Sequence, residues 1–298
     1  DFPQSYGLIR DVLVGDDLPV VTGFVAATGS GVTTTLGRNG SDYTASIVGA
    51  GADASVIEIW TDVDGVYSAD PRFVTDAFVL PEISYQEAME LSYFGAKVIH
   101  PYTMVPAVEQ GIPLRIKNTL NPDAVGTLIA AHTSSRSEFI TGIASVESVA
   151  LINVEGGGMV GLPGVAGRIF TALANAKINI IMISQASSEH SICFVIPDHD
   201  ADRAARALDD ELSRELSQKK VQRVATERDL EIVAVIGENM KGKPGISGRL
   251  FEALGTAAIN VLAIAQGSSE MNISFVVHGA ARESAINAVH GAFFGAAK

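Results

Sequence analysis

Apolar and polar residues follow two different periods along the first part of this chain. Continuous apolar runs bounded by glycine or polar residues are typical of buried strands, while apolar positions three and four residues apart are typical of helices. Strands that alternate with helices predict an α/β domain with a mostly parallel sheet. The expected elements are strands at 18–28 and 56–61, a helix at 41–51 capped by Ser41, a turn-rich stretch at 62–71 and a helix at 84–94.

The second part of the chain contains an internal repeat. Residues 149–196 align with residues 230–277 without a gap, at an offset of about 81 positions and with roughly 22 identities. Each copy has a strand, a glycine loop, an amphipathic helix, two strands joined by a polar turn, and a second helix. In the first copy we expect these elements at 149–154, 161–164, 165–176, 179–185, 191–196 and 200–219.

A polar stretch with proline and glycine, residues 118–137, separates the two parts and is the expected linker. We therefore predict three segments. They are an α/β domain at 1–130, the first copy of the repeat at 138–222 and the second copy at 223–298. The chain begins at Asp1 and soon enters an apolar run without a helix or capping signal, so we interpret it as a fragment.

Composition narrows the class of protein. The length of 298 residues suits two to three domains, and 47% hydrophobic with 18% charged residues is typical of globular proteins. A net charge of −13 argues against nucleic acid as a partner, because such surfaces need clustered Lys and Arg. No apolar run is long enough to cross a bilayer, so we expect no membrane partner. Cys193 is the single cysteine, which suits a cytoplasmic location.

Two loops in the first part carry candidate chemistry. Residues 33–42 combine glycines and hydroxyls with Arg38, which can grip a carboxylate, and Asp42, which can hold an ammonium group. This set fits an amino-acid substrate, and the alternative is a flexible loop with a helix cap. Residues 61–67 follow an apolar strand, where open α/β sheets place ligands. A calcium loop is excluded by the missing ligand positions, and a plain turn remains open.

Other motifs favour structural roles. Residues 156–161 match the dinucleotide pattern G-x-G-x-x-G, but the second copy lacks the central glycine, and no acidic residue ends the next strand. His100 lies beside a proline and is expected to be structural. Lys97 follows a short glycine turn and can reach a phosphate, although a solvated surface lysine is the alternative. Cys193 lies on an apolar strand as a structural thiol. We expect no metal site.

Taken together, the motifs resemble the aspartokinase family in sequence and in order. The segments that carry the resemblance are TLGRNGSD at 35–42, WTDVDGVY at 60–67, DPR at 70–72 and SYQEAMELSYFGAKVIHP at 84–101. The repeat is similar to two ACT domains, which bind free amino acids. Within the family, SQASSE at 184–189 and AQGSSE at 265–270 resemble the kinase part of the threonine-regulated bifunctional aspartokinase and homoserine dehydrogenase class.

The resemblance implies a fold and a reaction. The fold is the C-terminal half of an α/β amino-acid-kinase-type domain, followed by two α+β, ferredoxin-like ACT domains of order βαββαβ. The reaction is transfer of the γ-phosphoryl group of ATP, with Mg²⁺, to the β-carboxylate of L-aspartate, with threonine as the expected effector. ACT domains pair edge to edge, so we expect at least a homodimer.

The resemblance also implies roles for particular residues. We expect an aspartate site formed by Phe24, Arg38, Ser41 and Asp42. The nucleotide is expected to contact Thr61, Asp62, Tyr67, Arg72 and Lys97, with Arg72 and Lys97 facing its phosphates. The effector is expected at Ile183 and Gln185 in the first copy and at Ile264 and Gln266 in the second.

One departure from the family limits these expectations. The family begins with a Lys-Phe-Gly-Gly motif and takes a catalytic Lys and a substrate-binding Glu from its first half, and this chain has no such segment. The chain alone is therefore expected to be incomplete for catalysis. The main alternative is a non-catalytic amino-acid sensor in which the ACT pair is the working part. Another amino-acid kinase, for glutamate or a nucleoside monophosphate, is a third hypothesis, but those relatives lack the repeat.

Overall fold

The computed structural model describes residues 1–15, 17–96, 99–134, 138–157, 164–185 and 191–295. Contacts divide the chain into two compact units. The first unit consists of Asp1–Ala144 and Val235–Lys243, and the second consists of Ser145–Ala234 and Pro244–Lys298. A short piece of the second sequence copy, Val235–Lys243, thus belongs to the first unit. No helix in the described ranges is long and apolar enough to span a membrane.

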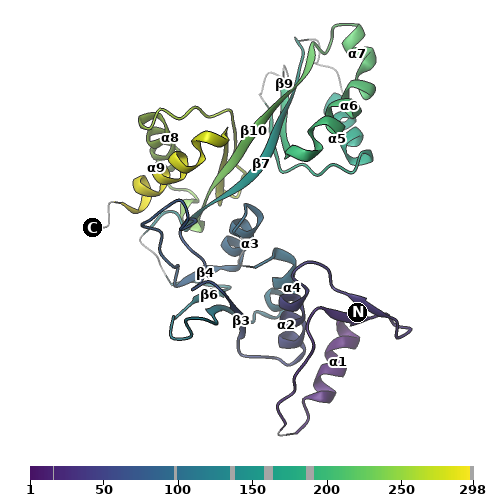
Figure 1. Cartoon of the computed structure of the whole chain (residues 1–298), viewed down its shortest axis with the longest axis vertical. Coiled ribbons are helices and arrows are strands. Elements are labelled where there is room, and N and C mark those ends of the chain that lie inside the picture. Colours follow the sequence, from purple (N-terminus) through teal and green to yellow (C-terminus); the bar gives the residue numbers. More distant parts are fainter. Residues whose placement is uncertain (16, 97–98, 135–137, 158–163, 186–190, 296–298) are drawn as a thin grey trace. The chain divides into compact units, whose positions relative to one another are not determined.

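The first unit is an α/β structure built around a small mixed sheet (Figure 1). Its helices are α1 (Phe2–Val12), α2 (Gly40–Gly51), α3 (Tyr85–Tyr93) and α4 (Pro101–Gln110). Its strands are β1 (Val25–Ala27), β2 (Thr33–Thr35), β3 (Ile57–Thr61), β4 (Glu82–Ser84), β5 (Leu114–Asn118) and β6 (Thr127–Ala130). Helix α2 packs against both α1 and α4.

The main sheet of the first unit has the order β3-β5-β6-β4. Strands β3 and β5 are parallel, as are β4 and β6, while β5 and β6 are antiparallel. The expected α/β fold is confirmed, but the sheet is mixed because β6 turns back directly beside β5. Since β3 and β5 run parallel and are paired up to Thr61 and Asn118, their carboxyl ends lie at the same edge.

Three sequence-based expectations for this unit are wrong. The run 18–28 is not a buried strand: β1 covers only Val25–Ala27, and Val20 is 94% exposed. An apolar run forms a strand only where a neighbouring strand pairs with it, and β1 pairs with the short β2 alone. Ser41 does not cap α2, since the helix begins at Gly40 after Asn39, whose φ is 54°. The expected linker contains β6, a strand of the sheet.

The second unit is dominated by two strands of 14 residues each, β7 (Gly142–Glu155) and β10 (Arg223–Ile236). The other strands are β8 (Met182–Gln185), β9 (Ser191–Pro197), β11 (Ala263–Ala265) and β12 (Asn272–His278). The helices are α5 (Val165–Asn175), α6 (Ala201–Glu211), α7 (Ser213–Ser217), α8 (Ile246–Thr256) and α9 (Arg282–Phe294). The six strands form one sheet in the order β11-β12-β10-β7-β9-β8.

Both long strands serve both copies of the repeat. Gln222 N donates to Glu155 O at one end of the β7–β10 pair, and Thr141 N donates to Ile236 O at the other, each over 2.7 Å. Strand β9 pairs with β7 only along 149–155. The remainder of β7 precedes the first copy in sequence and lies beside the first strand of the second copy. Each copy therefore obtains its last strand from outside its own sequence segment.

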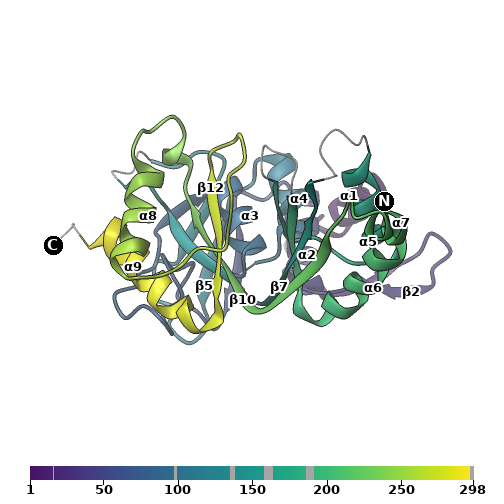
Figure 2. The same cartoon turned by 90° about the horizontal axis from the view of Figure 1, so that it is seen from above.

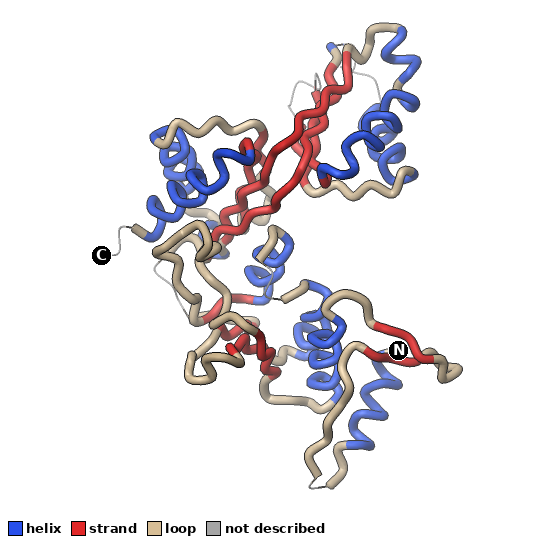
Figure 3. Tube along the Cα trace, viewed as in Figure 1, coloured by secondary structure: helices blue, strands red, loops and turns tan. Residues whose placement is uncertain are grey.

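The long strands change direction at equivalent points. Ser148 and Asp229 have φ values of 55° and 56°, and they occupy matching positions of the two copies. A left-handed residue interrupts the regular pleat, so each strand can leave one half-sheet and enter the other. Figures 1 and 3 show β7 and β10 running side by side, with α8 and α9 at one end and α5, α6 and α7 at the other. Figure 2 gives the same arrangement from above.

The helices of the first copy cover one face of its half-sheet. Ile169 and Leu173 of α5 pack with Leu208 of α6 against Phe194 of β9, and all four side chains are fully buried. The expected helix at 165–176 is confirmed by α5, whereas the expected helix at 200–219 is divided into α6 and α7. The glycine loop at 161–164 lies mostly outside the described residues, as do parts of the G-x-G-x-x-G match.

Gly65 is the tightest backbone position in the turn after β3. Its φ is 151°, and a Cβ there would lie 2.5 Å from Thr127 Oγ1, which accepts from Val66 N and donates to Leu80 O. We expect Gly65→Ala to lower the free energy of unfolding by about 2 to 4 kcal/mol. Gly248→Ala is the control, because a Cβ at that helical position meets no neighbouring atom, and the variant should have a slightly higher free energy of unfolding. Equal effects of the two changes in urea denaturation would contradict this reading.

Candidate functional site

The residues expected at the aspartate site gather around the N-terminus of α2. Phe24 has a φ of 72°, its N–H donates to Thr44 Oγ1 over 3.0 Å, and its O accepts from Leu36 N over 2.9 Å. A Cβ on Gly40 would lie 2.6 Å from the Phe24 ring, so only glycine lets the ring lie against the first turn of the helix. The loop of β1 and β2 is thereby fixed to the start of α2.

The charges at this helix end suit an amino-acid ligand. Partial burial raises the pKa of the Asp42 carboxyl group, while hydrogen bonds from Asn39 and Ser41 act in the opposite direction. Arg38 is exposed and forms no ion pair within the described part of the chain. An exposed guanidinium, a carboxylate and the free N–H groups of a helix N-terminus can together bind a group that carries both charges.

The expected nucleotide residues lie at the sheet edge where β3 and β5 end. Thr61 is the last residue of β3, and its O accepts from Thr119 N over 2.8 Å. Asp62 is exposed, and Thr61 Oγ1 donates to Asp62 Oδ1 over 3.2 Å. Tyr67 is half-buried and forms an isolated bridge with Val79. These three residues therefore lie at or shortly after the carboxyl end of β3, beside the end of its parallel neighbour β5.

Arg72 and Lys97, the two residues expected at the phosphates, are not confirmed by the structure as nucleotide contacts. Arg72 Nη2 forms an ion pair with Asp70 Oδ2 over 2.6 Å, and Arg72 Nε lies 3.0 Å from the same oxygen. Its side chain is still 67% exposed, but binding a phosphate would require the guanidinium to exchange or share this carboxylate. Lys97 lies outside the described residues.

Asn118 is a residue at this edge that sequence reasoning missed. Its amide nitrogen donates to Asp64 Oδ1 over 2.7 Å, and its Oδ1 accepts from Leu120 N over 2.8 Å. Asn121 donates to the same Asp64 oxygen over 3.1 Å. These bonds join the turn after β3 to the turn after β5. The signal available in the sequence was a polar residue at the end of an alternating run, Leu114–Asn118. In the structure, Asn118 is 8% exposed.

The expected effector residues lie on two strands that meet in the second unit. Gln185 ends β8, and Gln266 directly follows β11. Ser184 Oγ donates to Ile264 O over 2.8 Å, which brings these strands together although both are edges of the sheet. Ile183 and Ile264 are 47% and 43% exposed, which is unusual for isoleucine in strands. The contact thus joins the candidate effector segments of the two copies.

The surroundings of His100 and Cys193 support structural roles for both residues. His100 is the N-cap of α4, its Nδ1 accepts from Tyr102 N over 3.3 Å, and the two rings stack. Cys193 is half-buried, its Sγ lies 3.0 Å from Ser184 O, and burial raises the pKa of the thiol. A thiol with a raised pKa is a poor nucleophile, so both residues serve local structure.

Comparison with known proteins gives this geometry a family. Residues 2–118 match the amino acid kinase family, and residues 152–212 and 233–293 each match an ACT domain. The crystal structure of aspartate kinase from Clostridium acetobutylicum is similar over 98% of this chain and 67% of that chain, with 32% identity and a TM-score of 0.89. The chain belongs to the aspartokinase family.

Two further relatives refine the comparison. The bifunctional aspartokinase/homoserine dehydrogenase of Haemophilus influenzae is 49% identical over 86% of this chain and 31% of its own length. Aspartokinase III of E. coli, in complex with aspartate and ADP, has a TM-score of 0.80 at 30% identity, covering 99% of this chain and 65% of that one. The chain spans about a third of the length of the bifunctional relatives it matches.

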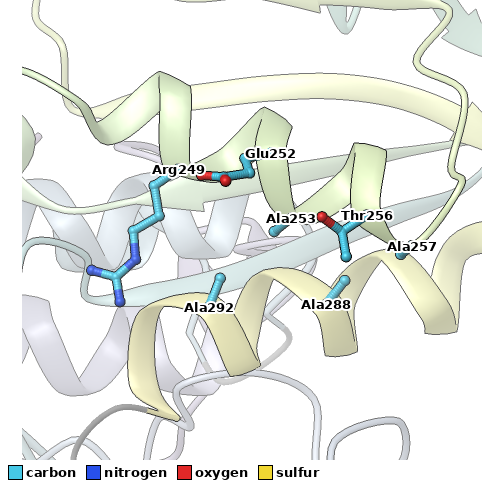
Figure 4. Close-up of a pocket in the computed structure, with 7 residues that line it drawn as sticks. All are labelled: Arg249, Glu252, Ala253, Thr256, Ala257, Ala288 and Ala292. Carbon is cyan, nitrogen blue, oxygen red and sulfur yellow. The ribbon is translucent and has the colours of Figure 1, made fainter.

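A groove on the second copy of this aspartokinase chain differs from the corresponding surface of the first copy. It has a volume of about 430 Å³ and lies between α8 and α9 (Figure 4). Arg249 extends from α8 toward α9, where Ala292 stands in the position that Glu211 has in the first copy. The groove is lined by Arg249, Glu252, Ala253, Thr256, Ala257, Ala288 and Ala292.

The equivalent arginine of the first copy has carboxylate partners. Arg168 Nε lies 2.6 Å from Glu211 Oε1, and Arg168 Nη1 lies 2.6 Å from Glu215 Oε1. The bond with Arg168 lowers the pKa of Glu215. Arg249 instead lies 5.1 Å from the ring centre of Phe293 and has no ion pair in the described ranges. The first copy therefore closes this surface with charge, and the second copy leaves it open.

We expect Arg168→Ala to lower the free energy of unfolding by about 1 to 2 kcal/mol, because a partly exposed network is worth a few tenths to 1 kcal/mol for each pair. Arg249→Ala, the matched control, should cost less than about 0.5 kcal/mol. Because the pKa of Glu215 is lowered in the folded state, the loss of unfolding free energy in Arg168→Ala should have its full size at pH 7. This loss should become smaller as the pH falls through and below the usual carboxyl range, where Glu215 becomes protonated. Urea denaturation across this pH range tests both points; equal losses at pH 7 would count against the network.

Proposed function

We propose that this chain is part of an aspartate kinase: the carboxyl-terminal part of its kinase domain and the paired ACT domains that regulate it. A β-carboxylate oxygen of L-aspartate attacks the γ-phosphorus of ATP. The bond from that phosphorus to the β–γ bridging oxygen breaks, giving aspartyl phosphate and ADP. The observation that carries the proposal is the joint presence of the α2 site and the β3–β5 edge in a chain of this family. The aspartate- and ADP-bound relative supports the same substrates.

The residues of this chain would bind and position rather than form covalent bonds. Phosphoryl transfer depends mainly on alignment and on neutralising charge, for which cations, hydroxyls and backbone N–H groups suffice. Arg38 and the α2 N-terminus would hold carboxylates of aspartate, and Asp42 would hold its ammonium group. Thr61, Asp62 and Tyr67 would contact the nucleotide at the edge of the sheet.

The described residues fit Mg²⁺ only as a companion of the nucleotide. No group of three His, Cys, Asp or Glu side chains in the described part of the chain could hold a metal ion. Asp64 already accepts bonds from two amides, which leaves Asp62 as the exposed carboxylate of the turn. Mg²⁺ typically binds through one or two carboxylates together with the phosphates, and there it would neutralise phosphate charge. Asp62 is the residue we propose for that contact.

The regulatory part of the proposal concerns threonine. Ile183 and Gln185 lie on β8, Ile264 lies on β11 and Gln266 directly follows it, and the two strands are in contact, so one effector region would draw on both copies of the repeat. Exposed isoleucines offer apolar walls, and the Gln amides offer a donor and an acceptor for the polar groups of a free amino acid. We further propose a homo-oligomer of at least two chains, assembled through the ACT domains.

A non-catalytic amino-acid sensor is the second candidate, and the exposed isoleucines of β8 and β11 are the observation that favours it. In that case the chain would bind an amino acid, and even the full-length protein would not phosphorylate aspartate. A hydroxamate assay of the full-length protein with aspartate, ATP and Mg²⁺ decides between the two. Hydroxamate formation supports the kinase, while amino-acid binding without turnover supports the sensor.

The role of Arg38 gives a prediction for the full-length enzyme. Arg38→Lys keeps the charge but loses the planar fork of the guanidinium, so a bidentate carboxylate contact weakens by about 1.5 to 3 kcal/mol. We expect KM for aspartate to rise about tenfold or more, while KM for ATP changes much less. Arg214→Lys, at an exposed position of α7, is the control. Equal changes in both KM values would show that the loop has only a structural role.

The effector residues give a second prediction. Gln266→Ala, and separately Gln185→Ala, leaves a polar group of bound threonine unpaired, which costs about 1 to 3 kcal/mol and lowers affinity about ten- to a hundredfold. Inhibition should weaken in parallel, with uninhibited kcat preserved. Calorimetric titration of this chain with threonine and with lysine measures binding, and Gln222→Ala is the control. Saturable lysine binding without a threonine response would refute threonine as the effector.

A further inference from the structure

The short segment that begins the glycine loop of the second copy is fastened to the kinase part of the chain. Val235–Lys243 belongs by its contacts to the first unit, although β10 and α8, the elements on either side, lie mainly in the second. A Cβ on Gly237 would lie 2.8 Å from both Ile140 Cα and Phe139 O, so the two backbones touch directly. Asn239 also donates to Glu138 O over 3.1 Å. The segment is therefore seated on this unit.

Glu87 of α3 is the side chain on which these contacts converge. It is 1% exposed, so its carboxylate depends on protein donors. Ser84 N donates to Glu87 Oε2 over 3.0 Å, and Glu238 N donates to Glu87 Oε1 over 3.1 Å. The hydroxyl of Thr141 donates to the same Oε1. One buried carboxylate thus joins the start of α3, the entrance to β7 and the loop of the second copy.

A second carboxylate completes the contact. Ser84 Oγ donates to Glu238 Oε1 over 2.7 Å and accepts from Glu87 N over 3.1 Å. Ser84 and Glu87 form the capping box of α3, in which each satisfies a backbone N–H of the helix N-terminus. Glu238 is therefore bonded to the two residues that define where α3 begins. A shift of the loop must either carry the start of α3 with it or break these bonds.

The described residues of the first copy show no equivalent of the Glu238 contact. The position of Glu238 is occupied by Gly157, which offers no carboxylate. The matching loop residue, Gly156, packs against Lys220 and Val221, which belong to the second unit like itself. The repeat thus provides an internal comparison of two matching residues: Gly237 touches residues of the first unit, whereas Gly156 touches residues of the second unit.

The position of α3 in the chain makes this contact consequential. Helix α3 ends at Tyr93, four residues before Lys97, a candidate phosphate contact. At its other end, the loop is covalently continuous with β10 and α8 of the second copy. Coupling between two sites requires an element that both sites can bias. The loop and the start of α3 form one bonded path that begins at β10 and α8 of the second copy.

We propose that the contact of Glu238 with Ser84 and Glu87 couples the effector state of the second copy to the kinase unit. Glu87 acts as a positioning residue: it holds the start of α3 in register with the loop. Effector binding moves the loop, and the two carboxylates transfer that movement to the start of α3. The inference rests on the proposed function, because it needs an inhibited kinase.

Glu238→Ala in the full-length enzyme is the primary test. The change removes the bond from Ser84 Oγ but keeps the backbone donor to Glu87, and Glu238 is only half-buried, so the fold should persist. We expect threonine affinity, measured by calorimetry, to stay within about twofold and uninhibited kcat to stay unchanged. The kinase activity that remains at saturating threonine should rise about fivefold or more. Glu252→Ala removes an exposed carboxylate of the same copy and should behave as wild type.

Ser84→Ala and the double variant Ser84→Ala/Glu238→Ala complete the cycle. If the two residues act through one bond, the double variant should lose no more inhibition than the single ones. Glu87→Gln keeps the volume of the side chain but places an amide NH₂ group beside the N–H and O–H donors that bind the carboxylate. We expect it to lose more inhibition than Glu238→Ala. Wild-type inhibition that persists unchanged in Glu238→Ala overturns the coupling proposal alone. A wild-type enzyme that responds to neither threonine nor lysine overturns this proposal and the proposed effector regulation together.

Discussion

The ACT part of this chain depends on the pairing of β7 with β10. The ladder is held at one end by the bond from Gln222 N to Glu155 O, and there Arg223 adds an ion pair with Glu155 over 2.7 Å, which lowers the pKa of that carboxyl group. Because each strand belongs to both copies, neither copy has a complete sheet without the other. Melting this ladder would remove one strand from each half at once, so the two copies should unfold as one cooperative unit.

This exchange of strands explains why the sequence repeat and the compact units differ. A repeat is recognised from matching side chains, and its copies begin at 149 and 230 because the identities begin there. The strand that each copy borrows lies before that point, where residues 142–148 and 223–229 share a single identical pair, Ala144 and Ala225. The left-handed residues Ser148 and Asp229, where each strand changes partners, are ordinary polar residues in sequence. Strand exchange is a property of pairing across the sheet, which periodicity along the chain does not encode.

The sequence was informative where local rules decide the structure. The helices expected at 84–94 and 165–176 follow from short-range patterns, and the structure has both, as α3 and α5. It misled where a neighbouring strand decides: residues 18–22 have the apolar character of a strand but form none, and β6 lies within the expected linker. Among the site residues, Asp64 and Asn118 come together only because β3 and β5 are parallel neighbours. Nothing in the spacing of these two residues predicts that pairing.

The two copies have the same fold, but their charged side chains find partners in different places. In the first copy, Arg168 is paired with its own Glu211 and Glu215, and the loop position that could carry a charge is Gly157. In the second copy, Arg249 has lost those carboxylates, and Glu238 reaches the kinase unit. The first copy is joined to the second by two connections: the β7–β10 ladder, and the bond from Ser184 Oγ to Ile264 O between β8 and β11. The capping box of α3 is thus connected to both copies, through Thr141 directly before β7 and through Glu238 in the loop of the second copy.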